Sequence, residues 1–224
     1  MLLLVAVVCA RPDSLVVNAS GVSSATAIWW GTPASRDVVV WFHGGMTSGN
    51  CVKGYVAGND FAKLFPKATV VSVSACMDKH WVTENMMNVV DAALDSVAAR
   101  RRAPVDEVRL VGVSDGSLGV IVYSATGRRR VKERLLMSTF GVTLGDAPRL
   151  AVQLKEKGGR WRFLQGGADR LYPPDRACPW IEAFCKSVGA DCELQYDAAG
   201  EHDWLYWKQN HFQWIRQAIF PGTP

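Results

Sequence analysis

The sequence predicts a single α/β domain: a doubly wound, mostly parallel sheet with helices on both faces and no large lid domain. Apolar, β-branched segments alternate with segments of helical periodicity from Asp37 to the end. The run 37–42 is almost continuously apolar, as a central strand covered on both faces requires. The chain has 224 residues, 49% of them hydrophobic and 21% charged, which suits one well-buried domain and is short for two.

Each element follows from its local pattern. Two leading strands are separated by the turn 18–21, the helix at 61–65 stops before Pro66, and apolar residues from Met86 to Val97 mark one helix face. Strands are expected at 15–17, 25–30, 37–42, 68–74, 107–113, 135–140, 161–164 and 192–196, and helices at 61–65, 84–99, 117–126, 147–157, 180–188 and 204–219. In such a sheet, functional residues gather in the loops that leave the carboxyl ends of the strands.

Residues 1–10 form an apolar run that is too short to span a membrane. Val8 and Ala10 fit the small-residue rule before a cleavage point, which favours a secretory signal, although no basic residue precedes them. An edge strand or a truncated start is the alternative. We therefore expect residues 1–10 to be a signal peptide or truncated segment, and residues 11–224 to be the single domain.

The net charge of +4 is mild and is concentrated in two clusters, 100–102 and 128–130. Each cluster follows a helical pattern and precedes a strand, where cations complement the negative end of a helix. Solvated helix ends are therefore favoured over a polyanion site, and no nucleic-acid partner is expected.

The segment Gly112-Val113-Ser114-Asp115-Gly116 matches G-x-S-x-G between a predicted strand and a predicted helix. A serine hydroxyl is a weak nucleophile, and a sharp turn presents it to a base and to backbone N–H groups. Ser114 is the candidate nucleophile. A chance small-residue turn is the alternative, so the rest of the chain must supply its partners.

Four histidines are candidate bases. His202 follows the last strand and starts the last helix, at the correct edge of the sheet and after the nucleophile in chain order. His43 is better explained as shaping the loop at Gly44, His80 has no orienting neighbour, and His211 lies inside the last predicted helix. His202 is therefore the predicted base.

The carboxylate that orients the base is predicted to be Asp169, which follows the 161–164 strand within a Gly-rich turn. Asp146 is the competitor, and Asp175 lies farther beyond its strand. For the oxyanion, the expected donors are the amides of Asp115 and Gly45, with Met46 as the second choice in the loop after His43.

These motifs resemble the α/β-hydrolase superfamily. The matching parts are 38–45, 112–116, 166–169 and 200–202, which occur in its Ser, Asp, His order. Within it the chain is similar to small carboxylesterases, feruloyl esterases and polyhydroxyalkanoate-depolymerase-like enzymes, although Ser117-Leu118 stands where relatives often carry a further glycine. The resemblance implies Ser114 as nucleophile, Asp169 as acid, His202 as base, and no metal or organic cofactor.

An aromatic rim for an apolar acyl group is expected from Trp81, Tyr172, Trp204, Tyr206 and Trp207, with core packing as the competing interpretation. Arg170 is the only cation that the sequence places near the site.

The six cysteines suggest an oxidising compartment. Cys51 and Cys76 fall in loops leaving strands expected to be neighbours, so a bridge there would brace the oxyanion loop. Cys185 with Cys192 is the second feasible pair, which leaves Cys178 reduced. We expect a secreted or cell-envelope protein, with the cytoplasm as the alternative.

The sequence thus predicts a serine hydrolase that cleaves small or polymeric carboxylic esters, without a stable membrane span and with an undetermined oligomeric state. A peptidase or thioesterase with the same triad is one alternative. The other is a non-catalytic binding module on the hydrolase fold.

Overall fold

The computed structural model describes residues 11–45 and 48–222. The signal expected at residues 1–10 lies outside them. Within the described residues no helix is long and apolar enough to cross a membrane. The strands are β1 (Asp13–Ala19), β2 (Val22–Trp29), β3 (Val38–Phe42), β4 (Thr69–Val73), β5 (Glu107–Val113), β6 (Arg130–Met137), β7 (Arg160–Gly166) and β8 (Cys192–Asp197). The helices are α1 (Lys53–Leu64), α2 (Glu84–Arg101), α3 (Asp115–Thr126), α4 (Ala147–Lys155), α5 (Pro174–Val188), α6 (Trp204–Asn210) and α7 (Phe212–Ile219), with a short 3₁₀ helix at Gly141–Leu144.

All eight strands form one sheet in the order β1-β2-β4-β3-β5-β6-β7-β8. The pairs β1 with β2 and β2 with β4 are antiparallel, and every pair from β4 to β8 is parallel. The predicted fold class, a mostly parallel sheet, is confirmed. Because β3, β5, β6 and β7 are parallel neighbours, the loops at their carboxyl ends meet at one edge of the sheet.

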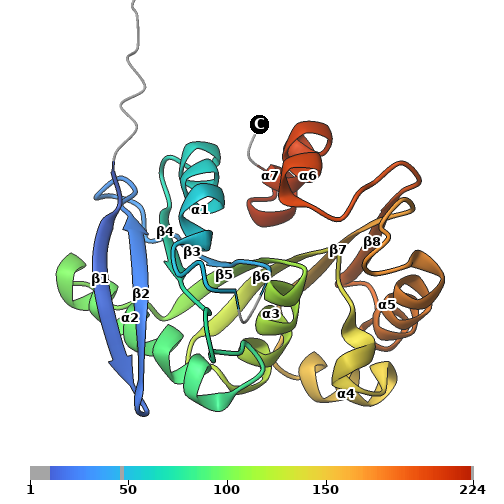
Figure 1. The fold of residues 1–224 in the computed structure, drawn as a ribbon, viewed down its shortest axis with the longest axis horizontal. Helices are drawn as coiled ribbons and strands as arrows, with labels where there is room; N and C mark the ends of the chain where they lie inside the picture. The colour runs from blue at the N-terminus through green and yellow to red at the C-terminus, as the bar shows by residue number, and fades with distance from the viewer. Residues whose placement is uncertain (1–10, 46–47, 223–224) are drawn as a thin grey trace, which may run out of the picture.

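Helices cover both faces of the sheet (Figure 1): α1, α6 and α7 lie on one face, and α2 to α5 lie on the other. The core is accordingly divided in two. Val38, Val40 and Phe42 of β3 belong to one buried cluster, whereas Val39 and Trp41 belong to the other. Successive side chains of a strand point to opposite faces, so a strand covered on both faces must be apolar throughout.

Helix α1 is longer than the periodicity predicts, since it begins at Lys53 and not at Phe61. The reason is tertiary. A Cβ atom on Gly58 would lie 2.4 Å from the indole ring of Trp29, so this glycine lets the helix pack closely on the sheet. Glycine has a poor helix propensity, and the local pattern therefore predicts a loop where the packed structure has a helix.

Other boundaries also differ, and three of them have a clear physical reason. Helix α5 begins at Pro174, because proline fits the first turn, where its missing N–H has no partner to lose. Strand β6 begins at Arg130, within a charged stretch that alternates exposed and buried positions. The single helix predicted at 204–219 is two helices, α6 and α7, because His211 leaves the helical region with a φ of −125°.

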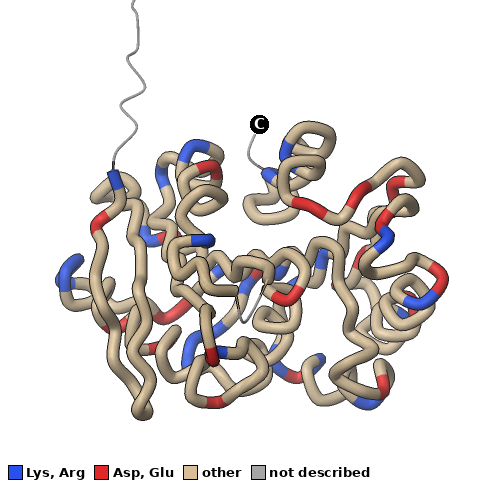
Figure 2. Tube along the Cα trace, in the orientation of Figure 1, with Lys and Arg blue, Asp and Glu red and all other residues tan. Residues whose placement is uncertain are grey.

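The arginine clusters have partners within the described chain, so they are ion-paired as well as solvated. Arg100 pairs with Asp13 at 3.2 Å and Arg128 with Asp95 at 2.7 Å, while Arg129 pairs with Asp95 and Arg130 with Glu107. Basic and acidic residues are interspersed along the whole trace (Figure 2). These ion pairs give the two clusters a structural role.

Candidate active site

Ser114 occupies the sharp turn between β5 and α3. Its φ of 55° and ψ of −127° are rare for a residue with a side chain, and the strain is held by the packed strand and helix on either side. The backbone N–H of Ser114 donates to the carbonyl of Met137 at 2.9 Å, which ties the turn to β6. The hydroxyl is thereby fixed at the carboxyl edge of the sheet.

The turn is possible only because of its glycines. A Cβ atom on Gly116 would lie 2.0 Å from the carbonyl oxygen of Phe42 in β3, which is far inside the van der Waals limit. This glycine allows α3 to start directly against the neighbouring strand. The G-x-S-x-G pattern is therefore required by the close approach of three elements.

Ser114, His202 and Asp169 form one chain of hydrogen bonds. The Nε2 atom of His202 lies 2.9 Å from Ser114 Oγ, and its Nδ1 atom lies 2.8 Å from Asp169 Oδ2 and 3.0 Å from Oδ1. With Nδ1 protonated toward the carboxylate, Nε2 carries the lone pair that faces the serine hydroxyl. The fold thus brings together three side chains from loops after β5, β7 and β8.

Asp169 is 2% exposed and is well supplied with donors. Its Oδ1 atom accepts the backbone N–H groups of Leu171 at 3.0 Å and Tyr172 at 2.8 Å. Burial raises the pKa of Asp169, but the hydrogen bond from His202 and the two amides outweigh it, so the pKa lies below the ordinary value. The carboxylate is therefore held charged beside the imidazole.

The loop that carries His202 is fixed by a second contact chain. Trp207 of α6 donates its indole N–H to Ser138 Oγ at 3.0 Å, and Ser138 donates its hydroxyl to the carbonyl of His202 at 2.9 Å. Ser138 follows β6, so the position of the imidazole depends on the sheet as well as on its own loop.

Tyr172 lies against Ser114 and His202. Its hydroxyl is 3.4 Å from Ser114 Oγ and donates to Asp115 Oδ1 at 2.9 Å, and its ring meets the His202 ring edge to face at 4.7 Å. Burial and the Asp115 carboxylate raise the pKa of Tyr172 to about 12. The phenol therefore remains protonated at neutral pH, and this predicted rim residue lies beside Ser114.

The loop predicted to bind an oxyanion lies beside the nucleophile. A Cβ atom on Gly44 would lie 3.0 Å from the Cβ of Ser114. Gly45, with a φ of 69°, lines a cavity that Ser114 also lines. Asp115 is the first residue of α3, so its amide stands at the positive end of that helix. Met46, the second choice in this loop, lies outside the described residues.

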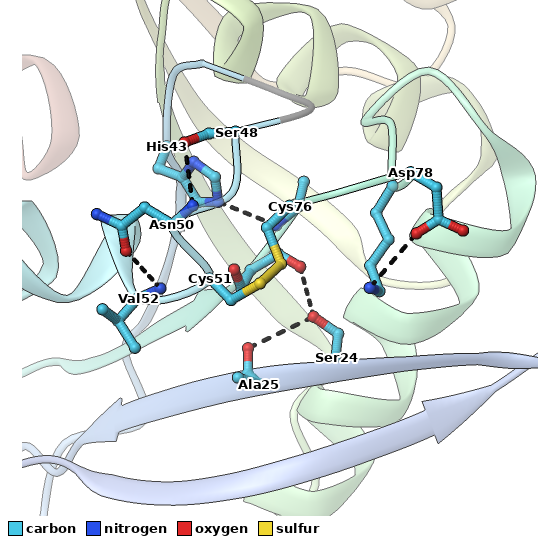
Figure 3. Close-up of a disulfide and its surroundings, with 12 residues drawn as sticks. Ser24, Ala25, His43, Ser48, Asn50, Cys51, Val52, Cys76 and Asp78 are labelled. Carbon is cyan, nitrogen blue, oxygen red and sulfur yellow. Dashed lines mark hydrogen bonds and ion pairs between the residues drawn. A yellow bond between two sulfur atoms is a disulfide. The ribbon is translucent and has the colours of Figure 1, made fainter.

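His43 and a disulfide hold this loop (Figure 3). The buried His43 ring accepts the N–H of Ala75 at Nε2, 2.9 Å away, while its Nδ1 lies 2.9 Å from the carbonyl of Gly44. Burial is the main cause that lowers the pKa of His43, so the ring is a neutral structural group. The disulfide between Cys51 and Cys76 confirms the first predicted pair and joins the loop to the exit of β4.

The cavity beside Ser114 has a volume of about 410 Å³. Trp204 lines it and stacks on Phe61 with ring centroids 4.5 Å apart, so this residue belongs both to the rim and to the core. The lining also includes residues that the sequence did not predict for the site, among them Lys53, Val56 and Leu171. Lys53 and Val56 lie on the part of α1 that local pattern predicts as loop. Arg170, the expected nearby cation, is exposed and is not among the lining residues.

Two predicted rim residues are core residues instead, so that part of the prediction is wrong. Trp81 is 0% exposed and packs on Phe42, and Trp207 is 0% exposed beneath the His202 loop. Tyr206 donates to Asp197 at 2.8 Å and is absent from the cavity lining. The side chains of Trp81 and Trp207 come from segments at this edge of the sheet, but they point into the protein.

The competing acids and bases have other roles. Asp146 caps α4 by accepting the N–H of Arg149 at 2.8 Å, and Asp175 lies in the first turn of α5. His211 lies 2.8 Å from Asp197, and His80 is absent from the lining of the cavity that contains Ser114. The second predicted disulfide, Cys185 with Cys192, is confirmed, and Cys178 is the free cysteine of the described part of the chain.

Comparison with known proteins identifies solved structures with a similar fold. No protein-family model and no curated protein sequence matches the chain. Among solved structures, it is similar to a cold-adapted esterase from an Arctic intertidal metagenomic library, with a TM-score of 0.67, 16% identity and coverage of 93% of this chain and 94% of that one. MPT51 of Mycobacterium tuberculosis gives a TM-score of 0.71 and 17% identity over 94% and 99% of the two chains.

An acylaminoacyl peptidase of Pyrococcus horikoshii is also similar, with a TM-score of 0.67 and 11% identity, over 92% of this chain and 40% of that one. At these identities the likeness concerns the fold. Together with the strand order and the elbow at Ser114, it shows that the protein has the α/β-hydrolase fold.

Proposed function

We propose that this protein is a serine hydrolase that cleaves carboxylic esters through an acyl-enzyme on Ser114. The observation that carries the proposal is the chain of hydrogen bonds from Ser114 Oγ to His202 Nε2, at 2.9 Å, and from His202 Nδ1 to the buried Asp169, at 2.8 Å. Ser114 and His202 line a cavity. The order of the hydrogen bonds lets His202 accept the serine proton while Asp169 stabilises the resulting imidazolium. The similar fold of structures described as esterases supports the same class of reaction.

In the acylation step, Ser114 Oγ attacks the ester carbonyl carbon while its proton passes to His202 Nε2. The carbonyl oxygen becomes an oxyanion near the amides of Gly45 and Asp115, each worth on the order of 3 kcal/mol if it donates there. Collapse of this intermediate breaks the bond to the alcohol oxygen, which takes the proton from His202. An alcohol leaves and an acyl-Ser114 ester remains.

In the deacylation step, His202 removes a proton from water as the water oxygen attacks the acyl carbon. The bond to Ser114 Oγ then breaks, and Oγ takes the proton back from His202. The product is a carboxylic acid, and the protein is restored. Asp169 stabilises the imidazolium in both steps without being protonated itself.

A fluorophosphonate probe tests the nucleophile. We expect intact-mass spectrometry to show one adduct on the wild-type protein, peptide mapping to place it on Ser114, and Ser114→Ala to remain unlabelled. His202→Ala should lower kcat for p-nitrophenyl acetate by about 10⁴-fold or more, since loss of one triad member disables the unit. His80→Ala is the matched control and should retain activity. Folded wild-type protein that is neither labelled nor active on esters would refute the proposal and favour a binding module.

The same side chains would also cleave thioesters or amides, and the similarity to an acylaminoacyl peptidase keeps a peptidase as the second candidate. A panel with one acyl group presented as ester, thioester and anilide separates these activities. The highest kcat/KM is expected for the ester. A higher value for the anilide would replace the esterase by a peptidase.

We also propose that the protein works in a secreted or cell-envelope compartment. The two disulfides support this, because cysteines in the cytosol are kept reduced in most organisms. Counting free thiols by mass spectrometry on protein from its native host checks the point. A protein with every thiol free would argue for the cytoplasm.

A further inference from the structure

We infer that Lys53 makes the cavity beside Ser114 selective for esters that carry an anionic group such as a carboxylate. The inference rests on the proposed function and names the substrate class of the same site. Lys53 is the first residue of α1 and lines the cavity together with Ser114 and His202.

The position of the ammonium group is defined by Gly45. A Cβ atom built on Gly45 would lie 2.1 Å from Lys53 Nζ and 3.2 Å from its Cε. The end of the lysine side chain therefore rests directly on the loop that is expected to bind the oxyanion. A substrate whose carbonyl sits between Ser114 and Gly45 has this cation beside it.

The ammonium group of Lys53 has no direct partner among the described residues. Across residues 11–45 and 48–222, Lys53 forms no ion pair and donates no hydrogen bond, whereas Lys208 on the neighbouring helix α6 pairs with Asp60 at 2.9 Å. The walls around it include the apolar side chains of Val56 and Leu171. Because Lys53 is exposed and no described residue pairs with it, its ammonium group is available to an anion that enters the cavity.

Helix stability does not account for a lysine at this position. The first turn of α1 holds no acidic residue, and its N-cap, Val52, supplies no side-chain hydrogen bond. The positive end of the helix dipole therefore repels the ammonium group, and an Asp or Ser would stabilise the helix better. A role in binding a ligand in the cavity would account for the lysine.

The lining of the cavity also contains a residue of the opposite charge. Asp203 lines it next to His202 and caps α6, where its Oδ1 accepts the N–H of Tyr206 at 2.9 Å. An anionic substrate group is repelled by Asp203 and attracted by Lys53. The pair of charges therefore fixes the orientation of the substrate as well as its class.

The test compares charge-matched esters. One pair places the charge on the acyl side, mono-4-nitrophenyl pimelate against the 4-nitrophenyl ester of pimelamic acid. The other pair places it on the alcohol side, 4-acetoxybenzoate against 4-acetoxybenzamide. The measured quantity is the ratio of kcat/KM for the anionic member to that for the neutral member. This ratio cancels any general effect of a substitution on catalysis.

Lys53→Met removes the charge and keeps most of the aliphatic side chain. In at least one pair of esters, we expect Lys53→Met to lower the kcat/KM ratio about fivefold, as for the loss of a solvent-accessible ion pair. Lys53→Glu should lower the ratio further. Raising NaCl from about 0.05 to 0.5 M should reduce the wild-type preference, because salt screens such pairs. Lys63→Met is the matched control: it removes the same charge from the exposed last turn of α1 and should leave the ratio unchanged. The pair that responds shows which side of the ester faces α1.

Two outcomes are unfavourable and distinguishable. If the wild-type protein hydrolyses the neutral esters and the ratio is the same in wild type, Lys53→Met and Lys53→Glu for both pairs, the inference is wrong and the proposed function stands. If folded wild-type protein hydrolyses none of the four esters, the proposed function fails and the inference fails with it.

Discussion

At the scale of single residues, Asp169 shows how a buried charge is made tolerable. Its carboxylate is almost fully removed from solvent, yet the imidazole of His202 and the amides of Leu171 and Tyr172 donate to it. Since a charged acceptor gains more from each donor than a neutral one, these contacts outweigh desolvation and lower the pKa of Asp169. The residue that we propose to orient the base is thus also a source of stability.

This stability depends on pH in a defined direction. An acid with a lowered pKa in the folded state stabilises the protein above its unfolded pKa of about 4, and the contribution is lost as pH falls through the lower folded value. Asp169→Asn should therefore reduce the free energy of unfolding by about 1–3 kcal/mol at pH 7, with a deficit that shrinks below pH ~4. Urea denaturation at several pH values measures it. Asp146→Asn is the control, because asparagine caps a helix as well as aspartate does. An equal deficit at every pH would contradict the explanation.

At the scale of elements, the loop after β3 is held by more than its own sequence. His43, Ala75 and the Cys51–Cys76 disulfide connect it to the segment that leaves β4 (Figure 3). The second disulfide closes only the short connection between α5 and β8, at the far end of the sheet from β3. The two bridges are therefore expected to have different effects on activity.

Replacing both cysteines of a bridge by serine separates these effects. Loss of the Cys51–Cys76 bridge should cost about 3 kcal/mol of stability. It should also lower kcat roughly tenfold, because the loop that we propose to bind the oxyanion loses its brace. Loss of the Cys185–Cys192 bridge should cost about 2 kcal/mol and leave kcat nearly unchanged. Thermal unfolding and ester hydrolysis measure the two quantities. If both double variants lose kcat equally, the bridges act only through global stability.

At the scale of the whole molecule, Asp91 joins three elements on the face of the sheet away from α1. It is 1% exposed, accepts the hydroxyl of Tyr123 at 2.7 Å, and pairs with Arg128 and Arg129 at 3.3 Å each. Burial, followed by the hydrogen bond to Asp91, raises the pKa of Tyr123 far above its ordinary value. Helix α2, the end of α3 and the segment that leads into β6 are thus held together through one carboxylate.

Removing this carboxylate should be costly, because two arginines and a buried phenol lose their common partner. We expect Asp91→Ala to lower the free energy of unfolding by about 3 kcal/mol or more. Glu193→Ala, which breaks the more exposed pair with Arg162 at 3.2 Å, should cost less than about 1 kcal/mol. Urea denaturation of both variants provides the comparison. Equal losses would show that the Asp91 contacts contribute no more than a surface ion pair.

Some features followed from the sequence alone because they depend on local pattern. The apolar run of β3 marks a strand covered on both faces, and the glycines around Ser114 mark a turn that only they permit. Parallel strands then bring the loops of Ser114, Asp169 and His202 to one edge, although Ser114 and His202 are 88 positions apart. The strand order could not be derived in the same way, because pairing partners are distant in sequence.

Only the tertiary structure decided which side chains at that edge face the cavity. Trp81 and Trp207 point inward because Phe42 and Ser138, from other elements, provide a packing surface and a hydrogen-bond acceptor. Lys53 reaches the cavity because α1 begins eight residues before its periodicity indicates, with Gly58 packed on Trp29. Periodicity reports how one segment alternates between solvent and core. The direction of a loop side chain, and the start of a helix that contains glycines, depend on contacts with distant segments that no local pattern contains.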